Sequence, residues 1–178
     1  MIREACVETL SQSVAAAKKG ADRLELCADL HLDGLTPSVE LIKSVQARVD
    51  IPIRVMIRPR GGNFSYTESE LEEMRQSIKD CKQLGVDGVV FGVCKGNDLD
   101  ITVIRELAQL AQPLKVVIHK AIDTCSDPLT ALQKLIDLQL IDGVLTSGKG
   151  KTAYEGMTLL QEMQALAGNQ LEIGRAHV

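Results

Sequence analysis

The sequence predicts an α/β protein with the architecture of a TIM-type (β/α) barrel, incomplete, with about six of the eight βα units. Short apolar runs that are typical of strands alternate with helical patterns along the chain, which favours parallel strands with crossover helices. A short turn segment recurs where a helix ends and a strand begins, at residues 20–22, 85–88 and 141–143. No G-x-G-x-x-G motif follows the first strand, so a barrel is favoured over the alternative, a doubly wound sheet.

The expected elements follow one another in chain order. Thr36, before Pro37, is expected to cap the second helix, and Thr67 with Glu70 forms a capping box at the start of the third. The third helix is expected to end before Gly85, because glycine commonly follows the last helical turn. We expect strands at residues 2–8, 22–27, 88–92, 114–119 and 142–146, and a further strand, third in chain order, that runs from residue 53 into the segment 57–66. We expect helices at residues 11–19, 37–48, 67–84, 98–111, 127–138 and 152–167.

Composition narrows the range of partners and locations. The 178 residues carry a net charge of -4, and aromatic side chains make up only 2% with no Trp, which argues against nucleic acid as a partner. No apolar run reaches the length of about 18 residues that a membrane helix needs, so no membrane partner is expected. Five cysteines, an odd number without a C-x-x-C motif, favour reduced thiols and a cytoplasmic location.

The chain is expected to hold one partial barrel domain, residues 1–171, followed by a non-native tail, residues 172–178. The tail resembles the translation of a sequencing-adapter read-through, so His177 is left out of every predicted site. An incomplete barrel exposes the edges of its first and sixth strands, which favours a homo-oligomer or aggregation.

Alternation along the strands predicts a cluster of ionisable side chains inside the barrel. Side chains of a strand point alternately to opposite faces, and the face that the helices cover is apolar. If the apolar residues face the helices, then Glu25, Cys27, Arg58 and His119 point inward, close to the carboxyl ends of their strands. Active sites of TIM barrels lie at this end, and buried charges need one another as partners.

Six motifs in this order resemble the CutC family, whose members are named for copper homeostasis. The motifs are Glu4-Ala5-Cys6 and the segments 20–27, 34–38, 57–62, 119–123 and 145–148. The resemblance covers residue 1 to about residue 168, and it implies a TIM-type barrel in the cytoplasm that is associated with copper through cysteines at the barrel mouth. Lys120, Ile122 and Asn63 stand where the family usually has Arg, Phe and Asp.

The first functional hypothesis is a copper homeostasis protein that binds Cu(I) through Cys6 and Cys27. These residues lie on adjacent strands with compatible alternation, and soft thiolates suit Cu(I). The alternative for the pair is two small buried hydrophobic side chains, which is how free cysteine usually behaves. Cys94 lies after the fourth strand and could join the site, whereas Cys81 and Cys125 are expected to be structural.

The second hypothesis is an enzyme acting on a small anionic or phosphorylated substrate. Glu25, His119 and Asp123 would be its acid-base residues, and Arg58, Arg60 and Ser147 would bind the anion. The alternative for the acidic residues is that Glu4 and Glu25 pair with Arg58 and Arg23 and fill the barrel. The segment 148–152 looks like a phosphate loop, but Leu145 occupies the place of a required glycine, so the segment is expected to be the loop that opens the sixth helix.

Overall fold

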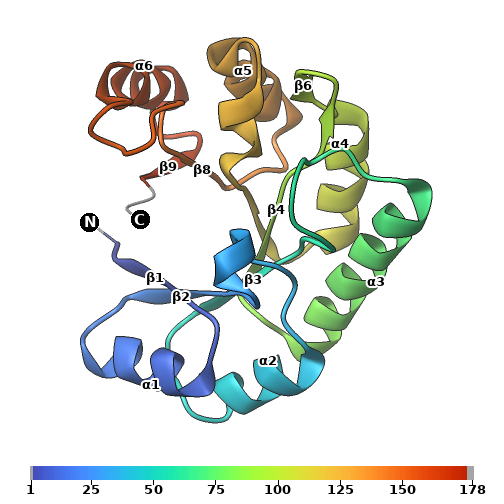
Figure 1. The fold of residues 1–178 in the computed structure, drawn as a ribbon, viewed down its shortest axis with the longest axis vertical. Coiled ribbons are helices and arrows are strands. Elements are labelled where there is room, and N and C mark those ends of the chain that lie inside the picture. Colours follow the sequence, from blue (N-terminus) through green and yellow to red (C-terminus); the bar gives the residue numbers. More distant parts are fainter. Residues whose placement is uncertain (1, 176–178) are drawn as a thin grey trace. The chain divides into compact units, whose positions relative to one another are not determined.

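The computed structural model describes residues 2–175, whose strands and helices alternate along the chain (Figure 1). These residues divide into two compact units, which are described separately. The first unit comprises residues 2–63, 67–90 and 113–115, and the second comprises residues 64–66, 91–112 and 116–175. None of the helices in this described range combines the length and the apolar character that a membrane span requires.

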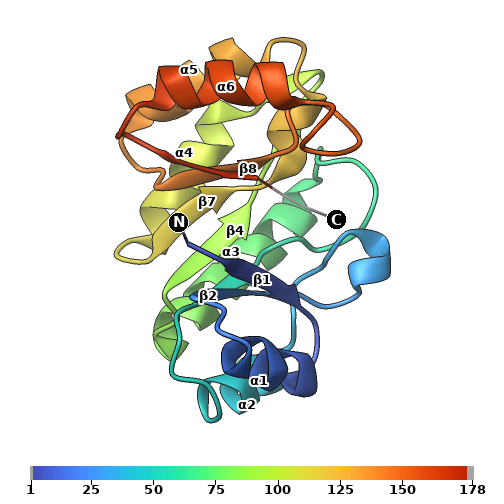
Figure 2. The ribbon, with the colours of Figure 1, turned by 90° about the vertical axis from the view of Figure 1, so that its left-hand side faces the viewer.

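The first unit is built on parallel strands that pair in chain order. They are β1 (Glu4–Val7), β2 (Arg23–Leu26), β3 (Ile53–Met56) and β4 (Gly88–Phe91). The helices are α1 (Leu10–Lys18), α2 (Val39–Gln46) and α3 (Glu68–Leu84), with a short 3-10 helix, η1 (Leu30–Leu32), between β2 and α2. Figure 2 shows α1 and α2 along one side of β1 and β2. The register places Cys6 opposite Glu25, and Glu25 opposite Arg54.

The second unit contains a further series of parallel strands. β7 (Lys115–Ile118), β8 (Gly143–Thr146) and β9 (Glu172–Arg175) pair in this order. Its helices are α4 (Ile101–Ala111), α5 (Pro128–Leu138) and α6 (Met157–Ala167), and α5 packs beside α6 (Figure 1). A small hairpin of β5 (Cys94–Lys95) and β6 (Asp98–Leu99) precedes α4, and a 3-10 helix, η2 (Lys120–Thr124), follows β7.

Both units repeat the same order, a parallel strand followed by a helix, which is the order of a TIM-type barrel. Residues 2–175 contain seven strands with parallel partners and six α-helices. The predicted fold class, an incomplete TIM-type (β/α) barrel, is therefore confirmed. All four residues of β2 and of β3 are buried, as expected for parallel strands whose two faces are both covered.

Three predicted helix starts are wrong, each for a local reason. Helix α2 begins at Val39, because the Ser38 hydroxyl accepts the Leu41 N–H, while the Thr36 hydroxyl accepts the backbone N–H of Arg58 instead. Helix α4 begins at Ile101 rather than at residue 98, because residues 98–99 pair with residues 94–95 in the hairpin. Helix α6 begins at residue 157, since residues 152–156 form turns.

The predicted domain boundary falls immediately before β9, whose residues Glu172–Arg175 pair with β8. The rest of the predicted tail, residues 176–178 with His177, lies outside the described residues. The assignment of residues 172–178 as a non-native tail stays a prediction.

The capping box at the start of α3 is confirmed and generates a stability prediction. The Thr67 hydroxyl accepts the Glu70 N–H, and the Glu70 carboxylate accepts the Thr67 N–H at 2.7 Å. We expect Thr67→Ala to lower the free energy of unfolding by about 1 kcal/mol, because it leaves a helix N–H without its acceptor. Urea unfolding measures this change.

The matched control is Ser77→Ala in the same helix, where the hydroxyl donates to the Glu73 carbonyl on the exposed face. This control should change the unfolding free energy by no more than about 0.5 kcal/mol. Equal effects of the two substitutions would contradict a capping role for Thr67.

Candidate metal centre

Two thiols and one carboxylate meet at the carboxyl ends of β1 and β2. The Cys6 and Cys27 sulfurs lie 3.6 Å apart, and Glu25 Oε1 lies 4.0 Å from the first and 3.9 Å from the second. One ligand atom from each of the three residues lies within 4.8 Å of the others, the arrangement of a group that could hold a metal ion. We call Cys6, Glu25 and Cys27 the thiol-carboxylate cluster.

The parallel register of β1 and β2 creates this cluster. Cys6 pairs with Glu25, and the Cys27 N–H bonds to the Val7 carbonyl at 2.9 Å, which continues the ladder past the end of β2. The three side chains therefore share one face, as the alternation predicted. Cys6 is exposed and the other two are buried, so the cluster has a solvent-facing side and an inner side.

The loop after β2 folds back against Cys27. Ala28 and Leu35 form an isolated antiparallel bridge, which returns the chain beside the end of the strand. Gly34 has φ +83°, and a Cβ at this position would lie 3.2 Å from the Cys27 sulfur. Only glycine combines this backbone conformation with so close an approach, so Gly34 shapes the inner wall of the cluster.

The cluster favours protonated ligands when no cation is bound. Burial raises the pKa of Glu25 to about 7, the negative charge of Glu4 adds to the shift, and Arg54 partly opposes it. The pKa of Cys27 is raised by its hydrogen bond with Cys6, by burial and by the Glu25 charge. Within residues 2–175, the hydrogen-bond partners of the Glu25 carboxylate are the two thiols. Binding of a cation by these ligands therefore requires the release of protons.

The neighbouring arginines are engaged by Glu4 rather than by Glu25. Glu4 Oε2 accepts from Arg23 Nε at 2.5 Å and lies 3.5 Å from Arg54 Nη1. Glu4 therefore pairs with Arg23 and Arg54, whereas the alternative considered from the sequence paired Glu4 and Glu25 with Arg58 and Arg23. Arg54 shares the alternation of Arg58 on the third strand, and this signal was available in the sequence.

Arg58 binds backbone carbonyls of two loops in the first unit. Its guanidinium donates to the carbonyls of Leu32 at 2.9 Å, Gly34 at 3.2 Å and Gly62 at 3.0 Å. The side chain is buried, so these bonds fix the loop after β2 to the loop after β3. Because Arg58 also reaches the segment around Gly34, it supports the wall of the thiol-carboxylate cluster.

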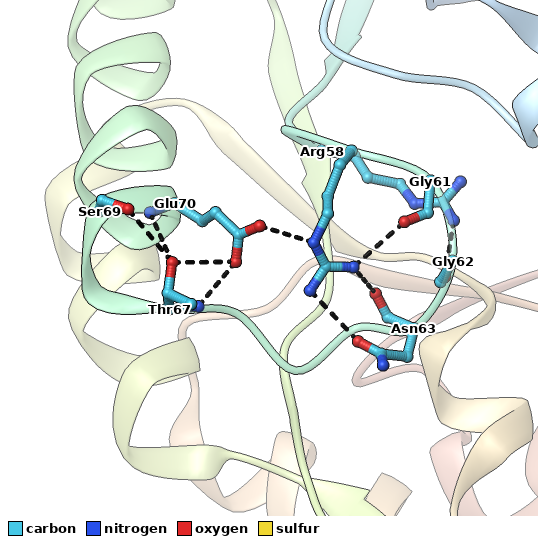
Figure 3. A network of polar contacts seen from close by, with 8 residues as sticks. Arg58, Gly61, Gly62, Asn63, Thr67, Ser69 and Glu70 are labelled. Carbon is cyan, nitrogen blue, oxygen red and sulfur yellow. Dashed lines mark hydrogen bonds and ion pairs between the residues drawn. The ribbon is translucent and has the colours of Figure 1, made fainter.

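Arg60 extends the same network to the start of α3, where Figure 3 shows Glu70 beside Thr67 and Ser69. Its Nε donates to Glu70 at 2.6 Å, and its Nη1 donates to the carbonyls of Gly61 and Asn63. Glu70 is also the carboxylate of the capping box, so one side chain joins the loop to the helix. The predicted anion-binding role of Arg58 and Arg60 stays a prediction, and the contacts observed here hold loops in place.

In the second unit, Asp123 binds the loop that follows β8. Its Oδ1 accepts from the Thr146 hydroxyl at 2.5 Å and from the Lys149 N–H at 3.2 Å. Its Oδ2 accepts from the Ser147 N–H at 2.9 Å and from the Ser147 hydroxyl at 3.1 Å. The structure thus brings Asp123 and Ser147 together, and the carboxylate takes backbone N–H groups that a phosphate loop would offer to its ligand.

His119 ends β7 and caps η2. Its Nδ1 accepts the Ala121 N–H at 3.1 Å, and its ring lies 4.7 Å from the Phe64 ring. Gly92 makes room for it, because a Cβ there would lie 2.6 Å from the imidazole. The catalytic roles predicted for Glu25, His119 and Asp123 stay predictions.

Comparison with known proteins places this chain in a family. The family model described as CutC matches residues 1–175. The chain belongs to the CutC family. It is 44% identical over 174 residues to a CutC family protein of Parabacteroides distasonis, which covers 97% of this chain and 71% of that protein.

Two further comparisons agree with this membership. The human protein named copper homeostasis protein cutC homolog is 40% identical over 163 residues, which span 91% of this chain and 59% of that one. The crystal structure of CutC from Streptococcus agalactiae superposes with a TM-score of 0.91 at 32% identity, covering 98% of this chain and 87% of that one. The fold of this chain is therefore the fold of a solved CutC protein.

The raised pKa of Glu25 predicts how the stability of the metal-free protein depends on pH. The folded carboxyl group holds its proton up to about pH 7, whereas the unfolded group loses it near its ordinary pKa of 4.5. The contribution of Glu25 to the free energy of unfolding is therefore fully present below pH 4.5. It is lost as pH rises through 7, and the loss amounts to at most about 3 kcal/mol. Glu25→Gln should remove this loss, so the variant gains on the wild type between about pH 5 and about pH 8.

The free energy of unfolding in urea, measured for the metal-free proteins at about pH 5 and about pH 8, tests this expectation. Glu73→Gln, on the exposed face of α3, is the control and should keep the pH dependence of the wild type. A parallel loss of stability in wild type and Glu25→Gln would show that Glu25 does not titrate in this window.

Proposed function

We propose that this chain acts in copper homeostasis by binding Cu(I) at the thiol-carboxylate cluster. The observation that carries the proposal is the pair of thiols 3.6 Å apart on β1 and at the end of β2. Metal–thiolate bonds measure roughly 2.3 Å, so two sulfurs at this separation can contact one ion without movement of the strands. Membership of a family whose relatives are named for copper homeostasis supports the same conclusion.

The chemistry of the ligands supports Cu(I) over harder cations. Thiolates select soft ions such as Cu(I), while a single carboxylate offers too few oxygens for Mg²⁺ or Ca²⁺. Each thiol must lose its proton to bind the ion, so binding releases protons. The exposed Cys6 meets the ion first, and the buried Cys27 then completes a two-sulfur site that is shielded from water. Free cysteines without a C-x-x-C motif support a reducing location such as the cytoplasm for this role.

An anaerobic titration with Cu(I) against a chromophoric Cu(I) chelator tests this proposal. The double variant Cys6→Ser, Cys27→Ser should bind one equivalent less than the wild type, because serine hydroxyls do not replace soft thiolate ligands. Cys81→Ser is the matched control, because Cys81 is a buried thiol in α3 and is not a member of the thiol-carboxylate cluster. Unchanged stoichiometry and affinity in the double variant would refute the proposal.

Glu25 distinguishes Cu(I) from Zn²⁺ as the ion of this cluster. A carboxylate is a good ligand for Zn²⁺ and a poor one for Cu(I). Glu25→Gln should therefore weaken Zn²⁺ binding by roughly 10–100-fold and change Cu(I) binding much less. Competition titrations with both ions measure the two affinities. A larger loss for Cu(I) than for Zn²⁺ would contradict the assignment of the thiols as its ligands.

A barrel enzyme acting on a small anionic or phosphorylated substrate is the second candidate. The pKa of Glu25 near 7 favours it, because a general acid-base group works best when its pKa lies near the working pH. Arg58 and Arg60, the residues proposed to bind the anion, are occupied by loop carbonyls and Glu70, which favours the copper proposal. Thermal stabilisation by phosphate in the wild type, absent from Arg60→Ala, would support the enzyme instead.

A further inference from the structure

The second unit contains another pair of thiols, Cys94 and Cys125. Cys94 begins the hairpin strand β5 after β4, and Cys125 follows η2 after β7. Both therefore lie in segments that follow the carboxyl ends of parallel strands, where barrel proteins bind their ligands. Their sulfurs contact Ala121 and Thr124 of the same unit, whereas the thiol-carboxylate cluster belongs to the first unit.

The two thiols converge on one backbone carbonyl. The Cys94 sulfur lies 3.9 Å from the Ala121 oxygen, and the Cys125 sulfur lies 3.8 Å from the same atom. The two sulfurs thus approach one acceptor from two different segments, the hairpin strand β5 and the end of η2. Thr124 Oγ1 lies 3.6 Å from the Cys94 sulfur and donates to the Ala121 oxygen at 2.7 Å. The pair is thus surrounded by polar atoms rather than by apolar side chains alone.

The electrostatics of this pair differ from those of an isolated structural cysteine. Burial raises the pKa of Cys81, a lone thiol in α3, to about 12. The neighbouring Cys125 thiol instead lowers the pKa of Cys94 to about 7, against the effect of its burial. The two thiols therefore influence each other, which agrees with their convergence on the Ala121 oxygen. Two converging thiols are ligands of the type that a soft cation such as Cu(I) prefers.

We propose that Cys94 and Cys125 form a second soft-metal site, which takes one Cu(I) ion between the two sulfurs. One Cu(I) ion and two thiols give a bis-thiolate copper complex and two protons, and the copper keeps its oxidation state. Cys94 retains 7% of its exposure and Cys125 none, so the ion reaches Cys94 first. The Thr124 hydroxyl can rotate from the Ala121 carbonyl to a thiolate and stabilise the charged complex.

The anaerobic Cu(I) titration with a chromophoric chelator separates this proposal from the proposed function. We expect the wild type to bind two equivalents of Cu(I). The double variant Cys6→Ser, Cys27→Ser should bind one equivalent, and so should the double variant Cys94→Ser, Cys125→Ser. If the Cys94, Cys125 variant binds like the wild type while the Cys6, Cys27 variant binds no copper, the second site is refuted and the first stands. If only the Cys94, Cys125 variant loses copper, the second site stands and the first is refuted.

A copper-independent probe covers the case in which substitution of the buried Cys125 prevents folding. The variant Cys6→Ser, Cys27→Ser, Cys81→Ser keeps both thiols of the pair and no other cysteine. Phenylarsine oxide bridges two adjacent thiols, so native mass spectrometry should show one arsenic adduct per chain. Adding Cys94→Ala, which keeps Cys125, should abolish the adduct. Absence of an adduct in the folded variant, with both thiols alkylated after unfolding, would overturn the proposal.

Discussion

The burial of ionisable side chains on one face of β1, β2 and β3 is the constraint on which the candidate site depends. A charge away from water needs a partner or must be neutralised. Glu4 takes Arg23 and Arg54 as its partners. Glu25 lies opposite Arg54 in the register, yet its hydrogen bonds within the described chain come from two thiols. Protons neutralise this cluster near neutral pH, and a soft cation is the alternative that keeps it paired.

The loops that follow the strands are held by charged side chains that bind backbone atoms. In the first unit, the Arg58 guanidinium donates to carbonyls of the loops after β2 and β3. In the second unit, the Asp123 carboxylate accepts N–H groups of the loop after β8. Buried hydrogen bonds to charged groups contribute about 1.5–3 kcal/mol each, so these residues rigidify the walls of the sites. A rigid loop keeps Gly34 against Cys27 and preserves the separation of the thiols.

The sequence could predict features that follow from periodicity, and not those that depend on loop conformation. Alternation along parallel strands is sufficient to place Cys6, Glu25 and Cys27 on one face, and the pattern of Thr67 and Glu70 is sufficient for a capping box. The carbonyl partners of Arg58 could not be predicted, because the loop after β2 turns through left-handed conformations at Asp29 and Asp33 that no local pattern indicates. The convergence of Cys94 and Cys125 on the Ala121 carbonyl was missed for the same reason, since the β5–β6 hairpin and η2 create it.

The central claim is that Cu(I) is held by sulfur at the end of β1 and β2. X-ray absorption spectroscopy at the copper edge tests it most directly, because the first coordination shell distinguishes sulfur from nitrogen and oxygen. The measurement is made on Cys94→Ser, Cys125→Ser protein loaded with one equivalent of Cu(I), so that the thiol-carboxylate cluster is observed alone. The account predicts a first shell dominated by two sulfur atoms, from Cys6 and Cys27. A shell of nitrogen and oxygen atoms, without sulfur, would contradict it.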